Sequence, residues 1–288
     1  MTNYVEEILE FGSAGSLRGV LVEPSSGQRH EAPAILTWNV GLNHQVGTYR
    51  FFVDLTRALA ALGFTSLRFD LSGWGDSELA ADDERAALER AVAELREAMA
   101  TLTQLRGFQS FVPIGFCSGV DAAHVLTVSD ARVVGVVHVE GYGYRTRGFY
   151  LRYWRRFVNR DRWERLFRLK VLKQKLNARA MTTEDERSFV RHYPSPQQLD
   201  SDLSEIVARG VRLLLVYVGG DTDHAYREQL LEIITQDAVA QRLELEFYPD
   251  ADHALFLVED RRRVVERIGS FMREHFGITA AERIVDGL

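Results

Sequence analysis

The chain contains one cysteine, six prolines and no long uninterrupted apolar run. A single cysteine excludes an internal disulfide and a metal site built from several thiolates. No stretch approaches the ~18 apolar residues of a membrane-spanning helix, and the first residues lack the basic and apolar regions of a secretory signal. We therefore expect a cytoplasmic protein with no membrane span. Its lone thiol, Cys117, is either a buried core residue or a reactive group.

No excess of positive charge is present. The 35 lysines and arginines face 41 aspartates and glutamates, which gives a formal net charge of -6. This balance provides no electrostatic reason to expect a nucleic-acid partner. With 288 residues, 46% of them hydrophobic, the chain is long enough to bury a sizeable core.

Short apolar segments alternate with helical patterns along most of the chain, after an N-terminal pair of strands that reads as a hairpin. Such alternation is typical of a mostly parallel sheet covered by helices on both faces. We therefore predict an α/β fold. Strands are expected at residues 4–11, 16–23, 34–38, 65–71, 111–116, 133–139, 212–218 and 243–248, and helices at 51–60, 84–105, 118–128, 225–234 and 261–276.

Residues 142–208 interrupt this alternation with arginines crowded among tyrosine, tryptophan and phenylalanine. We predict that residues 1–141 and 209–288 form the α/β core and that 142–208 form a helical cap over the active-site face. The arginines of an amphipathic helix pair would lie in solvent or against acidic neighbours. The alternative is that some face an anionic substrate group, such as the phosphopantetheine of a carrier protein.

Residues 115–119 (GFCSG) fit a sharp turn between a strand and a helix. In a G-x-S-x-G turn the backbone of the nucleophile is strained, and the flanking glycines leave room for close packing. Here Cys117 occupies the nucleophile position, with a strand pattern before it and a helix pattern after it. The N-terminus of a helix also stabilises a thiolate, so cysteine suits this place chemically. The sequence therefore predicts Cys117 as a nucleophile.

The partners of such a nucleophile follow it in the order acid, then histidine. His253 follows the last predicted strand and is the candidate base. Asp221, directly after the strand at 212–218, is the first candidate for the acid. Asp223 in the same loop and Glu140 after the strand at 133–139 remain alternatives.

An oxyanion hole requires backbone amides close to the nucleophile. One amide is expected from Ser118, the residue after the nucleophile. The other is expected from the loop at residues 39–47, where Val40 or Gly41 could donate because the glycine allows close approach of a substrate.

Residues 68–77 (RFDLSGWGDS) match a stretch, R-x-D-x-x-G-x-G-x-S, that is common in α/β hydrolases. Together with the loop at 39–47, the turn at 115–119 and residues 248–253, this stretch resembles a bacterial subset of serine-aminopeptidase-like hydrolases with cysteine at the nucleophile turn. The resemblance covers about residues 32–275, apart from the cap, and implies an α/β-hydrolase fold. It also implies similarity to enzymes encoded beside biosynthetic and surface-polysaccharide genes.

The residues and the resemblance together predict acyl transfer, with a small-molecule or carrier-bound ester or thioester as substrate and an acyl-cysteine intermediate. Release of the acyl group to water would make a hydrolase, and release to another nucleophile an acyltransferase. The alternative from another class is a non-catalytic protein that binds acyl ligands. No metal or organic cofactor is implied. Dehalogenase and epoxide hydrolase chemistry would require an aspartate at position 117, which the cysteine excludes.

Overall fold

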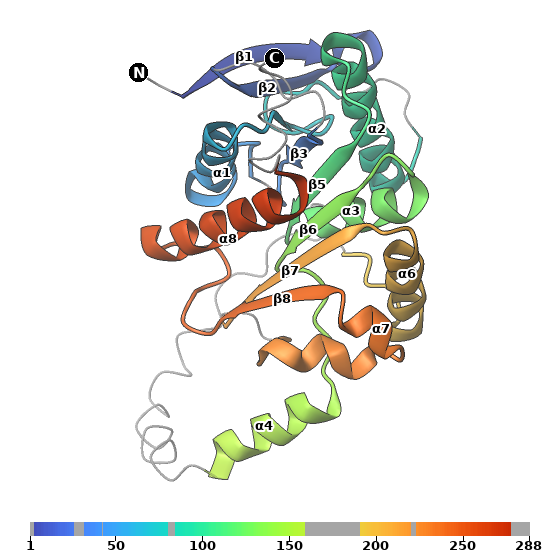
Figure 1. Cartoon of the computed structure of the whole chain (residues 1–288), viewed down its shortest axis with the longest axis vertical. Helices are drawn as coiled ribbons and strands as arrows, with labels where there is room; N and C mark the ends of the chain where they lie inside the picture. Colours follow the sequence, from blue (N-terminus) through green and yellow to red (C-terminus); the bar gives the residue numbers. More distant parts are fainter. Residues whose placement is uncertain are drawn as a thin grey trace, which may run out of the picture.

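The computed structural model describes residues 3–25, 32–41, 43–79, 84–158, 191–219 and 223–277. Their strands form one 8-stranded sheet in the order β1-β2-β4-β3-β5-β6-β7-β8 (Figure 1). The strands are β1 (Tyr4–Phe11), β2 (Leu17–Pro24), β3 (Ala34–Trp38), β4 (Ser66–Phe69), β5 (Phe111–Phe116), β6 (Gly135–Val139), β7 (Arg212–Val218) and β8 (Leu243–Tyr248).

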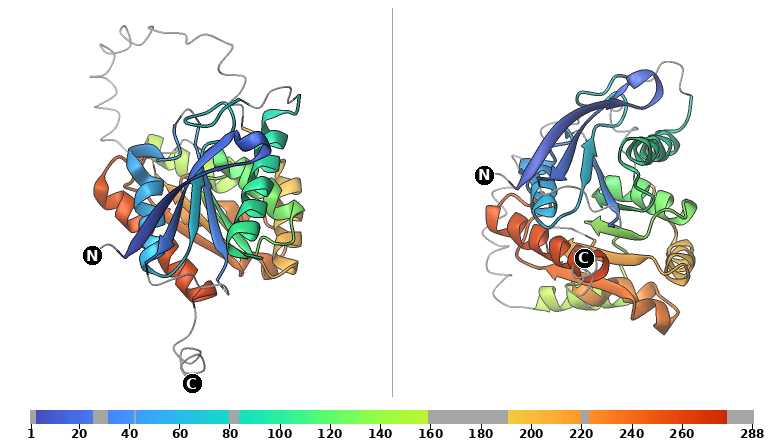
Figure 2. Two further views of the ribbon diagram at one scale, coloured as in Figure 1. Left: turned by 90° about the horizontal axis from the view of Figure 1, so that it is seen from above. Right: turned by 45° about the horizontal axis from the view of Figure 1, so that its top comes forward.

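The sheet is mostly parallel. β1 pairs with β2 and β2 with β4 in antiparallel register, and all other neighbours run parallel. β3, β5 and β6 are buried along their whole length, as expected for strands covered on both faces. Figure 2 shows β1 and β2 at one edge of the twisted sheet. The predicted α/β fold is confirmed.

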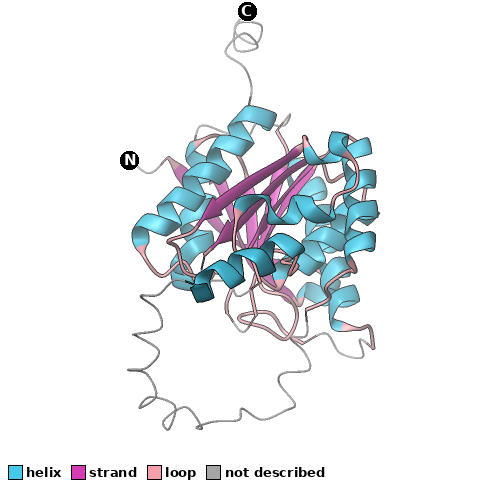
Figure 3. Ribbon diagram, turned by 90° about the horizontal axis from the view of Figure 1, so that it is seen from below, coloured by secondary structure: helices cyan, strands magenta, loops and turns pink. Residues whose placement is uncertain are grey.

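Two helical layers cover the sheet (Figures 1 and 3). α1 (Phe51–Ala61) and α8 (Val258–Phe276) pack on one face, and α2 (Ala87–Arg106), α3 (Gly119–Ser129) and α6 (Pro196–Ala208) pack on the other. Each layer buries the apolar side of its helices in its own hydrophobic cluster, as amphipathic helices require. This arrangement fixes the carboxyl ends of the central parallel strands at one edge, where α/β proteins place their ligands.

The structure differs from the expected helix at residues 225–234. Residues Arg227–Ile233 form a 3₁₀ helix, η6, and a short helix, α7 (Asp237–Ala240), follows it. The Gln229 side chain is fully buried, donates to the carbonyl oxygens of Tyr144 at 2.7 Å and Asp223 at 2.6 Å, and accepts from the amide of Ala225 at 2.8 Å. We attribute the tight turn to these tertiary hydrogen bonds, which outweigh local helix propensity.

Two described helices fall within the predicted cap at residues 142–208. α4 (Arg147–Val158) packs against η6, and α6 packs on α3. Residues 159–190 lie outside the described part of the chain, so the division at residues 142–208 stays a prediction. The remaining short 3₁₀ helices are η1 (Ser13–Gly15) and η2 (Thr48–Arg50).

Within the ranges that the structure describes, none of the helices combines the length and the apolar character needed to cross a bilayer.

Candidate active site

Cys117 stands at the tip of the turn between β5 and α3, with a left-handed φ of 49°. Its amide donates to the carbonyl oxygen of Val139 at 2.8 Å, and its carbonyl accepts from the amide of Val120 at 3.1 Å. A left-handed conformation is costly for a residue other than glycine and persists only where surrounding contacts impose it. These bonds therefore hold a partly exposed thiol at the carboxyl edge of the sheet.

Gly115 is required by the close packing of the turn. A Cβ atom at this position would lie 2.7 Å from the Gly119 carbonyl oxygen and 2.8 Å from the Val120 Cα. Both neighbours are backbone atoms, which cannot move aside without shifting α3.

We expect Gly115→Ala to destabilise the fold by about 1–3 kcal/mol, the usual cost of overpacking. Urea unfolding monitored by circular dichroism would measure the loss. Gly269→Ala in α8 is the control, because its Cβ would meet only the flexible end of Leu62 at 3.1 Å. That substitution should be neutral or stabilising by up to about 1 kcal/mol. Equal losses in both variants would contradict the steric account.

His253 reaches Cys117 from the loop after β8. Its ring interacts with the Cys117 side chain, and its Nδ1 lies 2.9 Å from Oε2 of Glu140. The imidazole is about half exposed and the Glu140 side chain is fully buried. Since Nδ1 faces the carboxylate, Nε2 is the nitrogen left for Cys117. The structure thus aligns a thiol, an imidazole and a carboxylate in series.

Glu140 is positioned by the neighbouring strand. It follows β6 directly, with a left-handed φ of 56°, and its amide donates to the Val216 carbonyl oxygen at 2.8 Å. Its Oε1 accepts from the Val218 amide at 2.6 Å, which leaves Oε2 for His253. Both carboxylate oxygens therefore have donors, as a buried charge requires.

Of the other two candidate acids, only Asp223 lies in the described part of the chain. Asp223 forms an ion pair with Arg145 at 2.7 Å between Oδ1 and Nε, at the protein surface. Asp221 lies outside the described residues, so its assignment as the acid stays a prediction. Of the two candidates in the described part of the chain, Glu140 is the one whose carboxylate the structure places on His253.

Asp252 fixes the loop that carries His253, a role that the sequence did not reveal. Its Oδ1 accepts from the Ala254 amide and its Oδ2 from the Phe256 amide, both at 2.9 Å. Leu255 in this loop has a left-handed φ of 54°. Aspartate side chains in tight loops commonly accept from the amides two and four residues later in the chain. The position of Asp252 directly before His253 was therefore the sequence signal for this role.

The hydrogen bond to Cys117, followed by the one to Glu140, raises the pKa of His253 from 6.5 to about 10. The imidazolium is therefore the form that the folded protein favours at neutral pH. A group whose pKa is higher in the folded than in the unfolded chain stabilises the fold below the unfolded pKa and loses this contribution as pH rises through the folded pKa.

We accordingly expect the stability difference between the wild type and His253→Ala to be largest below pH 6.5 and to shrink as pH rises toward about 10. Urea unfolding at several pH values would measure it. A difference that grows with rising pH would contradict the assigned sign.

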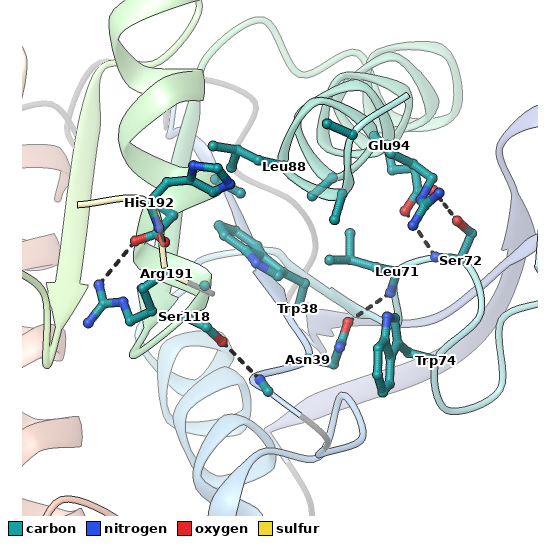
Figure 4. A pocket seen from close by; sticks show the side chains of 18 residues that line it. Trp38, Asn39, Leu71, Ser72, Trp74, Leu88, Glu94, Ser118, Arg191 and His192 are labelled. Atoms are coloured by element: carbon teal, nitrogen blue, oxygen red, sulfur yellow. Dashed lines mark hydrogen bonds and ion pairs between the residues drawn. The ribbon is translucent and has the colours of Figure 1, made fainter. Parts of the chain in front are cut away.

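The two predicted oxyanion regions meet in the structure. The Gly41 amide donates to Oγ of Ser118 at 2.9 Å (Figure 4). Gly41 has a left-handed φ of 52°, and Val40 is buried. The Gly41 amide thus points toward the residue after Cys117, where an oxyanion donor is needed.

Asp70, from the sequence stretch that carried the resemblance, ties the loop at residues 39–47 to the loop after β4. Its buried carboxylate accepts from the amides of Gln45 at 2.7 Å and Asp76 at 3.2 Å. A Cβ at Gly75 would lie 2.3 Å from this carboxylate, which explains the glycine. The contact positions the segment that bears Gly41.

His44 completes a group of three side chains that could in principle hold a metal ion. Its Nε2 lies 3.1 Å from Oδ2 of Asp70 and 2.8 Å from Oδ2 of Asp76, and the three ligand atoms lie within 4.8 Å of one another. Because Asp70 already accepts two backbone amides, we assign this group to tethering the loop. A second such group, Glu244, Glu274 and His275, lies away from Cys117, on β8 and α8.

A cavity of about 380 Å³ adjoins Ser118 and Gly41. Its apolar wall includes Trp38, Leu71 and Leu88, and it lies between the starts of α2 and α3. Figure 4 shows Ser118 and Arg191 on one side of the cavity, and Glu94 with Ser72 on the other. Apolar walls with a few polar groups are the usual make-up of a small-molecule site.

Comparison with known proteins agrees with this architecture. The esterase Pf2001 of Pyrococcus furiosus has 14% identity and a TM-score of 0.61, covering 95% of this chain and 92% of that chain. A hypothetical protein of Pseudomonas aeruginosa has 17% identity and a TM-score of 0.61, covering 96% and 95%. The alpha/beta hydrolase GrgF of Penicillium sp. has 16% identity and a TM-score of 0.59, covering 95% and 100%. At these identities the likeness shows the fold alone.

No curated protein gives a significant match to the sequence. The profile of the alpha/beta hydrolase family matches residues 36–267, which span β3 to most of α8 and include the turn at Cys117 and the loop of His253. With this match over most of its length, and with the sheet order and strand-to-helix turn described above, the chain belongs to the α/β hydrolase family.

Proposed function

We propose that the protein cleaves esters or thioesters by acyl transfer through Cys117, His253 and Glu140. Family membership supports hydrolase chemistry in general. The observation that carries the finer assignment is the hydrogen bond of His253 to the buried carboxylate of Glu140, with the imidazole also interacting with the Cys117 side chain. This proposal replaces Asp221 with Glu140, which was one of the two alternatives from the sequence.

The proton of the Cys117 thiol passes to Nε2 of His253 before the substrate reacts, which gives the imidazolium described above. In the first half-reaction the thiolate attacks the carbonyl carbon. The resulting oxyanion is stabilised by the amides of Ser118 and Gly41, after the Ser118 hydroxyl has left the Gly41 amide. The carbonyl reforms and the leaving group departs with the proton of the imidazolium. Cys117 then carries the acyl group as a thioester.

In the second half-reaction, an acceptor attacks the acyl-cysteine while His253 removes its proton. With water the product is a carboxylic acid, and with another nucleophile it is a new ester, thioester or amide. Glu140 accepts the Nδ1 proton in a hydrogen bond throughout, which fixes the tautomer and stabilises the imidazolium. The high pKa of His253 fits this role, since the imidazolium is the form that protonates the leaving group.

Thioesters are the favoured substrates in this proposal. Transfer from one thioester to a cysteine exchanges bonds of the same kind, so the first step is nearly balanced in free energy. An amide substrate would lose resonance energy in the same step. The cavity beside Ser118 is lined by polar side chains as well as by Trp38, Leu71 and Leu88, so it is suited to an acyl group with both apolar and polar parts.

Steady-state kinetics with matched acyl thioesters and p-nitrophenyl esters would test this function. A burst of product equal to the enzyme concentration, followed by slower turnover, is expected if the acyl-cysteine accumulates. Adding thiol, amine or alcohol acceptors would separate hydrolysis from transfer. Binding of the substrates without any turnover would instead support the non-catalytic alternative.

A further inference from the structure

Arg191 lies beside the proposed site but takes no part in the two half-reactions of the proposed acyl transfer. Its Nη1 donates to the carbonyl oxygens of Glu140 at 3.3 Å and Gly141 at 3.1 Å. Its Nη2 forms an ion pair with Oδ1 of Asp121 at 3.1 Å, in the first turn of α3 (Figure 4). One guanidinium therefore connects the strand end that carries Glu140 with the helix that begins after Cys117.

The orientation of this guanidinium is fixed on several sides. It lies over the rings of Tyr193 at 4.8 Å and Tyr142 at 5.5 Å. The other oxygen of Asp121 accepts from the His192 amide at 2.6 Å. The Arg191 side chain is only 18% exposed and that of Asp121 only 6%, so the ion pair is poorly screened by solvent.

We propose that Arg191 is a positioning residue of the acyl-transfer site, which holds the backbone of Glu140 and Gly141 in place against α3. The assignment rests on the proposed function. Its basis is the fork of hydrogen bonds to Glu140 and Gly141 and the pair with Asp121. Arg191 and Cys117 also interact electrostatically: burial alone would lower the pKa of Arg191, but Asp121, Tyr193 and Cys117 raise it.

Other charged and titratable groups share this environment. Cys117 faces His253, which is in turn held by Glu140, while Arg191 faces Asp121 on α3 and His138 on β6. Tyrosines approach from the loops and from β7, namely Tyr142, Tyr144, Tyr193 and Tyr217. Burial lowers the pKa of His138 well below 6.5, so it stays neutral, and burial raises the pKa of Tyr142, Tyr144 and Tyr217 above 10.

The test is the steady-state kinetics of thioester cleavage, since displacement of Glu140 affects the chemical step through His253. We expect Arg191→Met to lower kcat about tenfold and to leave KM nearly unchanged.

Arg209→Met is the matched control. Arg209 donates to the carbonyl oxygens of Thr127 and Val128 at 2.8 Å and of Asp130 at 3.0 Å, at the opposite end of α3. It fastens the same helix through a similar number of bonds but lies far along the helix from Cys117. Its removal should leave kcat unchanged, which separates the hold on the Glu140 backbone from the loss of helix anchoring.

Arg191→Lys serves as the test if the methionine variant does not fold. Lysine keeps the charge but loses the planar fork. We expect kcat to fall about tenfold in this variant as well, because the Glu140 backbone is released. Wild-type kcat in Arg191→Lys or in Arg191→Met would overturn the proposal.

Failure of the proposed function would have a different signature. Cys117→Ala would then retain full turnover, whereas failure of the assignment of Arg191 alone would leave the loss in Cys117→Ala and abolish only the loss in Arg191→Met.

Discussion

Replacing Cys117 with alanine is expected to lower kcat for ester and thioester cleavage by about 10⁴-fold or more, as removal of a nucleophile does in catalytic triads. Alanine removes only the sulfur, and the bonds that hold the turn, from the Cys117 amide to Val139 and from the Val120 amide to Cys117, belong to the backbone. The variant should therefore fold like the wild type. Initial rates with an activated thioester would measure the loss.

Cys117→Ser distinguishes loss of the thiol from loss of packing. Serine is close to cysteine in shape and fits the same left-handed turn, but its hydroxyl does not ionise near neutral pH. We expect this variant to be as stable as the wild type and slower in turnover. Wild-type kcat in Cys117→Ala would contradict the assignment of the nucleophile.

Glu140→Gln is expected to have the second largest effect, a fall in kcat of about 10³–10⁴-fold. Glutamine can keep the hydrogen bond from the Val218 amide, but its NH₂ group then faces Nδ1 of His253. This arrangement favours the tautomer with the proton on Nε2, which cannot accept the Cys117 proton. The missing negative charge also lowers the pKa of His253.

Asp223→Asn is the matched control for this substitution. It makes the same change of carboxylate to amide, at a residue that pairs with Arg145 on the surface. Its kcat should stay within about twofold of the wild type, since a surface ion pair contributes little. Asp221→Asn completes the series, and a loss in either aspartate variant that exceeds that of Glu140→Gln would place the acid in the loop after β7.

The order of strands and helices could be predicted from the sequence because each element carries a strong pattern. β3, β5 and β6 read as apolar runs, and their burial on both faces is the cause of those runs. The segment at residues 225–234 was predicted incorrectly as an α-helix, because its conformation depends on Gln229, whose partners Tyr144 and Asp223 come from other loops. A local pattern does not contain such contacts.

The turn at Cys117 and the place of His253 were visible in the sequence because both depend on residues close together in the chain. The pairing of His253 with Glu140 joins residues 113 positions apart. Glu140 directly follows β6, but the expectation of an acid after a later strand favoured Asp221 over it. The register of β6 on β7 sets where Glu140 lies relative to the imidazole, and this register needs coordinates.

The roles of Arg191 and Asp252 could not be predicted from the sequence for a related reason. Arg191 is one of many arginines, and its contacts with Glu140 and Asp121 lie 51 and 70 residues away. Asp252 acts locally, but an aspartate in a loop is so common that its bonds to Ala254 and Phe256 do not stand out.

The central claim is that Cys117 carries the acyl group during turnover. Mixing the protein with activated acyl thioesters, quenching in acid and determining the intact mass and the modified peptide would test it most directly. The account predicts one acyl adduct on Cys117, absent in Cys117→Ala and formed far more slowly in His253→Ala. Turnover by the wild type without any adduct, or an adduct that forms equally fast in His253→Ala, would contradict it.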